Sequence, residues 1–472
     1  MVHESQVPRS CDRCHSLKER CRRTSKAPRC DRCTRTGRVC ETQRPTRRPG
    51  RPPARLKTRT ERKSHSSDTT ISTTSECSVT LAGCTLPWET LSSSFGNITQ
   101  QEMALLDKQV LHDDSIQLFV VGPSFCESHR ERLVFHLLSS RHPVLDGCLA
   151  LALCTGDKLQ IHDSYKHAAS ALFTLRSLSV VDEGDSASCL TLGWLVLQFA
   201  LRVGGEEVFD ICNQTLGLIK PYFDYERAFN SACSGFLTSL VLSEMAESLF
   251  KARVPTMRLD HPKAFTHVDS YVGLSTSLLP HLYDLAMINA AMHSNRFSTE
   301  HKDEDSEETA RQQEYLAMSL NVLECEVRSW KPNVPTDICD KYTAAEVAHM
   351  ICQAQVMQTA ILLIIHRLKY PFGTEDSVAR TLASNIINYA TLARQITGKL
   401  PVCIDLPLNV AILELGDDSE PAAVLSRIAL EDFHLGEFYK RFRIMIALVW
   451  RSRLLHHNVY WYNIGDIILS AS

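Results

Sequence analysis

Apolar positions recur with a helical period over most of the chain after about residue 100. Spacings of three and four residues place them on one face of a helix in each of four stretches. These positions are Leu316, Leu320, Leu323, Val327 and Trp330; Phe229, Cys233, Phe236 and Leu240; Val347, Ile351, Ala354, Met357 and Ile361; and Val378, Leu382, Ile386 and Tyr389. The pattern predicts ten or so helices without intervening strands, and therefore an all-α domain.

Glycine and proline mark the ends of these expected helices. The breaks fall at residues 204–205, at Pro255, and at residues 332–335 and 371–373. One stretch instead shows period two, with apolar residues at Val402, Ile404, Leu406, Leu408 and Val410. Because Pro407 stands inside it, this stretch predicts an extended connection rather than a sheet strand.

The first hundred residues have a different composition. Residues 41–63 are rich in Arg and Pro, and residues 64–80 are dominated by Ser and Thr. Such a segment buries too little apolar surface to offset its ordering entropy, so we expect a basic, then Ser/Thr-rich, disordered linker over residues 44–98. No heptad of apolar residues occurs there, and Pro87 interrupts the first apolar residues that appear. The linker would separate a small head, residues 1–43, from a large helical domain, residues 99–472.

The head carries two copies of a cysteine pattern, Cys-Asp-Arg-Cys-x6-Cys, at Cys11, Cys14 and Cys21 and again at Cys30, Cys33 and Cys40. Two tetrahedral zinc ions need eight ligand bonds, and six thiolates supply eight only if two of them bridge both metals. The internal symmetry nominates Cys11 and Cys30, the first cysteine of each copy. Such a site has no open coordination position, so the two Zn²⁺ ions would be structural and would supply folding free energy to the head.

These residues resemble the fungal binuclear zinc cluster, the Zn2Cys6 family of transcription regulators. The chain meets every cysteine interval of the family pattern. Lys18 and Arg20 precede the third cysteine, where the family is basic, and Gly37 falls where the second short helix must end, a position that favours a left-handed residue. The body looks like the helical regulatory region that follows the cluster in many fungal regulators, through phrases such as residues 278–283, 366–373 and 449–451.

The resemblance implies that the first helix of the head enters the major groove of double-stranded DNA and reads a CGG triplet. Lys18 matches the base-reading lysine of the family, and Lys or Arg contacting O6 and N7 of guanine is the commonest specific contact. A phosphate contact without base discrimination is the alternative for Lys18. Phosphate contacts are also the interpretation of four further basic residues, His15, Arg20, Arg22 and Arg23.

Residues 47–55 resemble an AT-hook, in which Arg51 would enter a narrow minor groove. The usual motif has Arg before the glycine, whereas this chain has Pro49. The alternative is a plain basic segment that follows the DNA backbone and serves as a nuclear localisation signal.

Charge is distributed unevenly along the chain. Residues 1–63 contain 20 Lys and Arg against 6 Asp and Glu, a balance of +14, and the remaining residues contain 31 against 48, a balance of −17. A basic head on an acidic body suits a module that binds a polyanion. The N-terminus has no secretory pattern, and the longest apolar runs look too short or interrupted to span a bilayer, so we expect a nuclear protein without a membrane partner.

The sequence therefore predicts a fungal sequence-specific transcription factor of the RNA polymerase II type. Its expected partners are double-stranded DNA and the transcription machinery or co-regulators. A zinc-dependent protein–protein adaptor without its own DNA specificity is the alternative. No catalytic motif of the P-loop, dinucleotide-binding, hydrolase or zinc-protease kind occurs, so we expect no enzyme. Because the usual coiled coil is absent, a homodimer through the helical domain stays open.

Overall fold

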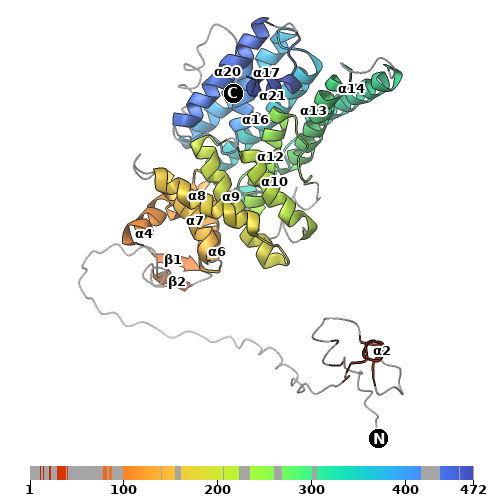
Figure 1. Cartoon of the computed structure of the whole chain (residues 1–472). Helices are drawn as coiled ribbons and strands as arrows, with labels where there is room; N and C mark the ends of the chain where they lie inside the picture. Colours follow the sequence, from red (N-terminus) through yellow and green to blue (C-terminus); the bar gives the residue numbers. More distant parts are fainter. Residues whose placement is uncertain are drawn as a thin grey trace, which may run out of the picture. The chain divides into compact units, whose positions relative to one another are not determined.

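The computed structural model describes residues 11, 14, 21–22, 29–38, 40, 78–81, 84–87, 99–139, 141–154, 161–205, 207–222, 234–259, 268–299, 306–415, 436–455 and 458–470. The chain divides into two compact units, Met1–Thr74 and Ser75–Ser472. In its described part, the first unit has the helix α2 (Asp31–Arg35) beside the cysteines. The second unit is built almost entirely of helices (Figure 1), which confirms the mostly α fold.

An antiparallel hairpin begins the second unit. Strand β1 (Ser78–Leu81) pairs with β2 (Cys84–Pro87), with Ser78 opposite Pro87 and Leu81 opposite Cys84. The sequence did not predict this hairpin, because its residues fall within the stretch expected to be a disordered linker. The rest of the expected linker, up to residue 98, lies outside the described residues.

The helices follow the hairpin along the chain, the first half up to α12 and the second half from η5 onward. The first contains α4 (Gln100–Leu106), the π-helical turn η1 (Asp107–Leu111), α5 (Asp113–Ile116), the 3-10 turn η2 (Pro123–Phe125), α6 (Cys126–Ser139), α7 (Arg141–Cys154), α8 (Ile161–Ser177), α9 (Glu183–Val203), α10 (Val208–Ile219), the 3-10 turn η3 (Lys220–Tyr222) and α12 (Ser234–Lys251). The second contains the 3-10 turn η5 (Thr276–Leu278), α13 (Leu279–Thr299), α14 (Ser306–Ser329), α15 (Ile338–Lys341), α16 (Ala344–Lys369), α17 (Asp376–Thr397), α18 (Asp405–Glu414), α20 (Gly436–Leu455), the 3-10 turn η7 (Trp461–Asn463) and α21 (Ile464–Leu469).

Two long apolar helices form the centre of the second unit. Helix α9 packs against α7, α8, α10 and α12, and α16 packs against α13, α14, α17 and α18. By length and composition alone, these helices could cross a membrane over Gly184–Val203 and Ala344–Lys369. The expectation that the apolar runs are too short or interrupted to span a bilayer is therefore wrong by that criterion. In each helix 72% of the apolar window lies inside the unit, and this core position accounts for the composition.

Helix α14 follows the predicted pattern, since Leu316, Leu320, Leu323 and Val327 are all buried. Helix α17 follows it only in part. Its buried face consists mainly of small residues, whereas Val378, placed on the core face by the sequence, is exposed. The buried residues of α17 are Ala379, Ala383, Ile386, Ala390 and Ala393. Alanines allow α17 to lie close against α16, so the larger apolar residues do not mark its core face. Of the stripe in α12, Phe229 and Cys233 lie outside the described residues.

The extended connection predicted for residues 402–410 is wrong, because α18 covers most of it. Pro407 is the third residue of this helix, where its missing N–H would have no intrahelical acceptor. Both faces of α18 are buried, from Leu406 to Glu414 with Asn409 as the exception. A helix buried all round shows no polar face, so its sequence cannot reveal a period of 3.6 residues.

The expected helix ends are confirmed. Helix α9 stops at Gly204, whose φ of 69° lies in the left-handed region, and α16 stops two residues before Pro371. Capping boxes begin α4 and α16, at Thr99 with Glu102 and at Thr343 with Glu346.

Candidate metal centre

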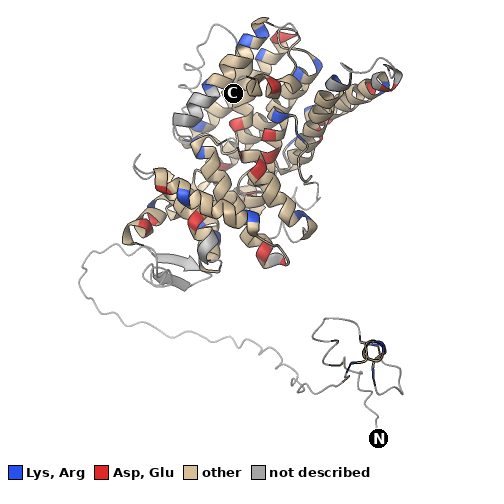
Figure 2. Cartoon of the chain, viewed as in Figure 1, with Lys and Arg blue, Asp and Glu red and all other residues tan. Residues whose placement is uncertain are grey.

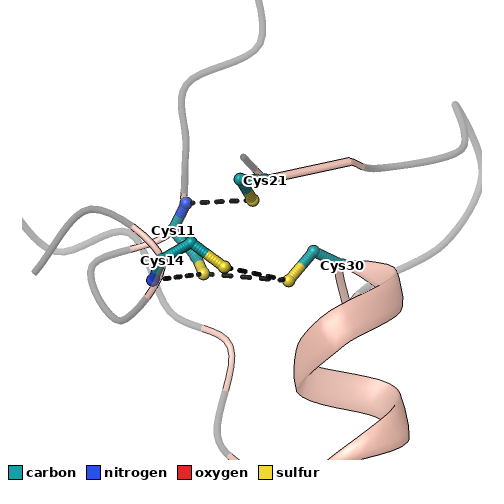
Figure 3. Close-up of side chains that lie close together, drawn as sticks. All are labelled: Cys11, Cys14, Cys21 and Cys30. Carbon is teal, nitrogen blue, oxygen red and sulfur yellow. Dashed lines mark hydrogen bonds between the residues drawn. The ribbon is translucent and has the colours of Figure 1, made fainter. Parts of the chain in front are cut away.

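All six cysteines of the repeated pattern come together in the first unit. Cys11, Cys14, Cys30 and Cys33 are fully buried, and Cys21 and Cys40 are partly buried. The sulfur of Cys30 lies 3.9 Å from that of Cys11 and 3.7 Å from that of Cys14, and Figure 3 shows these side chains pointing toward one another. These separations are far longer than the ~2.05 Å of a disulfide bond, and no disulfide joins any of the six cysteines.

The repeat in the sequence is reproduced in the hydrogen bonds around the sulfurs. The backbone N–H of Cys11 donates to Cys21 Sγ at 3.4 Å, and the N–H of Cys30 donates to Cys40 Sγ at 3.2 Å. Within each Cys-x2-Cys, the second N–H donates to the first sulfur, at 3.5 Å in both copies. The two halves therefore have equivalent local geometry around their first cysteine.

The sulfurs form two overlapping sets of four. One set is Cys11, Cys14, Cys21 and Cys30, the other is Cys11, Cys30, Cys33 and Cys40, and within each set all sulfurs lie within 4.8 Å of one another. Cys11 and Cys30 belong to both sets, as the bond count for two tetrahedral metals requires. With Zn–S bonds of about 2.3 Å, the sulfurs of a tetrahedral site stand roughly 3.8 Å apart. The three sulfur–sulfur separations of 3.7 to 3.9 Å fit such a site.

Local hydrogen bonding distinguishes the two shared cysteines from Cys14, Cys21 and Cys33. The backbone N–H of Cys33 lowers the pKa of Cys30 to about 6. Burial acts to raise the pKa of Cys11, but the N–H and thiol donors around it outweigh burial and lower this pKa. Burial raises the pKa of Cys14 and Cys21, and it raises that of Cys33 to about 12. In both sulfurs common to the two sets, the thiolate, which is the metal-binding form, is therefore favoured.

Helix α2 positions the second copy of the pattern. Cys30 is its N-cap, with its sulfur accepting the N–H of Cys33, and Asp31 lies at the positive N-terminal end. At the other end the N–H groups of Gly37 and Arg38 donate to Thr34 O and Cys33 O, the Schellman arrangement. Gly37 has φ of 62°, which confirms the left-handed position predicted from the sequence.

Basic residues surround the cysteines. Arg22, Arg29, Arg35 and Arg38 are exposed in the described part of this unit, where Asp31 is the acidic residue, and Figure 2 marks the basic residues on α2. The carbonyl of Arg22 accepts the N–H of Asp31 at 3.1 Å, so this candidate DNA contact is tied to α2. The other candidates, His15, Lys18, Arg20, Arg23 and Arg51, lie outside the described residues. The sequence analysis did not include Arg29, Arg35 and Arg38 among its candidate DNA contacts.

The comparisons with known proteins concern the second unit. The chain matches the fungal specific transcription factor domain over residues 155–467, about two thirds of its length, and the match does not reach the six cysteines of the repeated pattern. No curated protein and no solved structure matches the chain. The matching family is one of transcription factor domains and not of enzymes. On its helical unit, therefore, this chain belongs to the fungal specific transcription factor domain family.

Proposed function

We propose that this protein is a sequence-specific DNA-binding transcription factor that acts in the fungal nucleus, with a zinc-folded head that reads CGG-type triplets. The observation that carries the proposal is the pair of overlapping four-sulfur sets within an arginine-rich surface. The family of the helical unit supports the regulatory role.

The six cysteines would hold two zinc ions, with Cys11 and Cys30 bridging them. In the described part of the head the buried cluster consists of cysteine sulfurs alone, with no aliphatic or aromatic core. A module of this kind has too little apolar surface to fold by burial, and bound zinc supplies the missing folding free energy. Zinc held by these cysteines would be structural, since four thiolates around each ion would leave no open position.

Arginines of the head would bind DNA phosphates. Arg22, Arg29, Arg35 and Arg38 are exposed, and each phosphate contact releases counterions, so binding should weaken steeply as salt rises. Phosphate contacts position the head without selecting a sequence. Selection is assigned to Lys18, which would donate to O6 and N7 of guanine.

Metal analysis tests the shared thiolates. Native mass spectrometry of the full chain should show two zinc ions. Cys30→Ser removes a ligand common to both ions and should abolish the binding of both, whereas Cys21→Ser should leave at least one ion bound. One zinc in the wild-type chain, or equal losses in the two variants, would contradict the bridging arrangement.

A binding assay tests the reading of DNA. Lys18→Ala should lower the affinity of the full chain for a CGG duplex by about 1–3 kcal/mol and leave its affinity for a scrambled duplex nearly unchanged. Lys26→Ala removes the same charge between the two copies of the pattern and serves as the matched control. Equal losses on both duplexes would make Lys18 a phosphate contact. If neither duplex binds in a salt-dependent manner, the adaptor alternative replaces the proposal.

A further inference from the structure

Helix α14 has two apolar faces, and the rest of the unit covers one of them. Its inner face, formed by Leu316, Leu320, Leu323 and Val327, packs against α13 and α16. The amide of Gln358 donates to the carbonyls of Val327 and Trp330 at 2.7 and 3.1 Å, and so satisfies acceptors at the end of the helix. Figure 1 shows α14 beside α13 at an edge of the helical unit.

The outer face of α14 carries a second apolar stripe. Tyr315, Met318 and Val322 are 65%, 58% and 54% exposed, and Cys325 is exposed as well. Their spacing of three, four and three residues is that of coiled-coil contact positions. With 100° per residue, this stripe lies nearly opposite the inner one. Single exposed apolar residues are ordinary, but a stripe at contact spacing on an already anchored helix is typical of a helix–helix interface.

We propose that this stripe pairs with the same stripe of a second copy of the chain, with the two α14 helices antiparallel about a twofold axis near Met318. A twofold axis makes the interface self-complementary, so one apolar stripe is sufficient. The pairing places Tyr315 of each copy against Val322 of the other and buries both Met318 side chains at the axis.

The charges beside the stripe favour the antiparallel direction. Arg311 lies on the stripe one turn before Tyr315, and Glu326 flanks it one turn after Val322. The antiparallel pairing brings Arg311 of one copy opposite Glu326 of the other. A parallel pairing in register would set arginine against arginine and glutamate against glutamate, which is unfavourable. The antiparallel arrangement also opposes the two helix dipoles.

The interface accounts for a feature that the sequence left open. No heptad follows the cysteine cluster, so the usual means of joining two heads is absent. Pairing through α14 would bring two heads into one assembly by a different route. Association can be measured without DNA, so this inference stands or fails separately from the proposed reading of CGG.

Light scattering coupled to size exclusion of the full chain tests the interface. At tens of micromolar the wild-type chain should have twice the mass of one copy. The double variant Met318→Glu with Val322→Glu should have the mass of one copy and an unchanged far-ultraviolet circular dichroism spectrum. Phe173→Glu on α8, where the side chain is 75% exposed, is the matched control and should remain a dimer. A monomeric wild type, a dimeric double variant or a monomeric control would each overturn the proposal.

Cross-linking tests the direction of the pairing. Met318→Cys places two thiols at the axis, so mild oxidation should produce a cross-linked dimer that the wild-type chain does not form. In the antiparallel pairing the two native Cys325 residues stand about 20 Å apart along the helices, at 1.5 Å per residue. In a parallel pairing they would face each other. Rapid cross-linking through Cys325, or none through Met318→Cys, would overturn the antiparallel arrangement.

Discussion

Removing the guanidinium of Arg367 should destabilise the helical unit strongly. Its side chain is fully buried near the end of α16, and all five of its N–H bonds have acceptors. Nε and Nη2 donate to both oxygens of Glu414 at 2.6 Å, and Nη2 also donates to Asp376 at 2.6 Å. Nη1 donates to the carbonyls of Pro371 and Thr374, at 3.0 and 2.8 Å. One side chain thus joins α16, the following turn, α17 and α18.

Replacing Arg367 with Met keeps much of the volume but leaves the Glu414 carboxylate, 1% exposed, without its two donors. Removing one partner of a buried ion pair costs about 3–5 kcal/mol, mainly because the other charge stays buried and unpaired. We therefore expect a loss of that size in the free energy of unfolding. The double variant Arg367→Met with Glu414→Leu should lose less than Arg367→Met alone, because it removes the stranded carboxylate. Arg367→Lys should fall between wild type and Arg367→Met, since an ammonium cannot reproduce the planar fork.

Urea unfolding of the full chain, followed by far-ultraviolet circular dichroism, measures these changes because the signal comes mainly from the helical unit. Arg328→Met is the matched control: Arg328 also pairs with a glutamate, Glu324, but its side chain is 58% exposed. An exposed pair contributes about 0–1 kcal/mol, so the control should remain near wild type. If Arg367→Met changes the unfolding free energy by no more than the control does, the ion pair is not what holds α16 to α18.

Three further predictions concern single positions. Gly37→Val should destabilise the zinc-bound head by about 1–2 kcal/mol, because a β-branched residue is strained at positive φ. Gly37→Asn should destabilise the head less. A titration with a chelator, which measures zinc release, tests both variants. Burial in an aromatic cluster lowers the pKa of His129 to about 3. The fold therefore has its full stability from the neutral imidazole above pH ~6.5 and loses it as the pH falls toward 3. His129→Phe should flatten this part of the curve of unfolding free energy against pH, measured with urea. Burial acts to raise the pKa of Glu346, but hydrogen-bond donors from Ser124 and Thr343 outweigh burial and lower this pKa. The ionised carboxylate therefore stabilises the fold above pH ~4.3, and this stability is lost as the pH falls below that value. Glu346→Gln should lower the free energy of unfolding by about 1–3 kcal/mol at pH 7 and reduce the loss of stability on acidification, and an unchanged melting profile would contradict this account.

The sequence predicted the helices that have a clear period of apolar residues and the helix ends that are marked by glycine or proline. The stripe of α14, the ends of α9 and α16 and the left-handed Gly37 follow from spacing, glycine and proline. The sequence did not predict α18, because a helix buried on all sides lacks the alternation of apolar and polar faces that reveals a helical period. It predicted the wrong core face for part of α17, because close packing there places alanines, rather than larger apolar residues, on the buried face. It also could not show what residues 366–373 do, because the acceptors of Arg367 are partly 47 residues away, on Glu414.

The cysteine site follows the same distinction. The repeat and the bond count nominated two overlapping sets of four cysteines, and these sets do lie together in the structure. The number of ligands constrains a metal site strongly, whereas DNA contacts depend on where long side chains project. Spacing therefore gave the sulfur positions but not the exposed Arg29, Arg35 and Arg38.

The folding unit of the helical part must begin well before residue 155, where the family match starts. Backbone and side-chain groups of residues 117–124 bond to distant parts of the matched segment. The N–H of Val121 donates to Ser270 O at 2.8 Å, and the ammonium of Lys399 donates to Gln117 O at 3.0 Å. Helix α7 packs on α8 and α9, and a Cβ on its Gly147 would lie only 3.0 Å from Leu195 of α9. These contacts close over the apolar face of α9, which a chain beginning at residue 155 would expose to water. Since α4 packs on α7 and begins with its own capping box at Thr99, the folding unit includes α4 and extends at least to that residue.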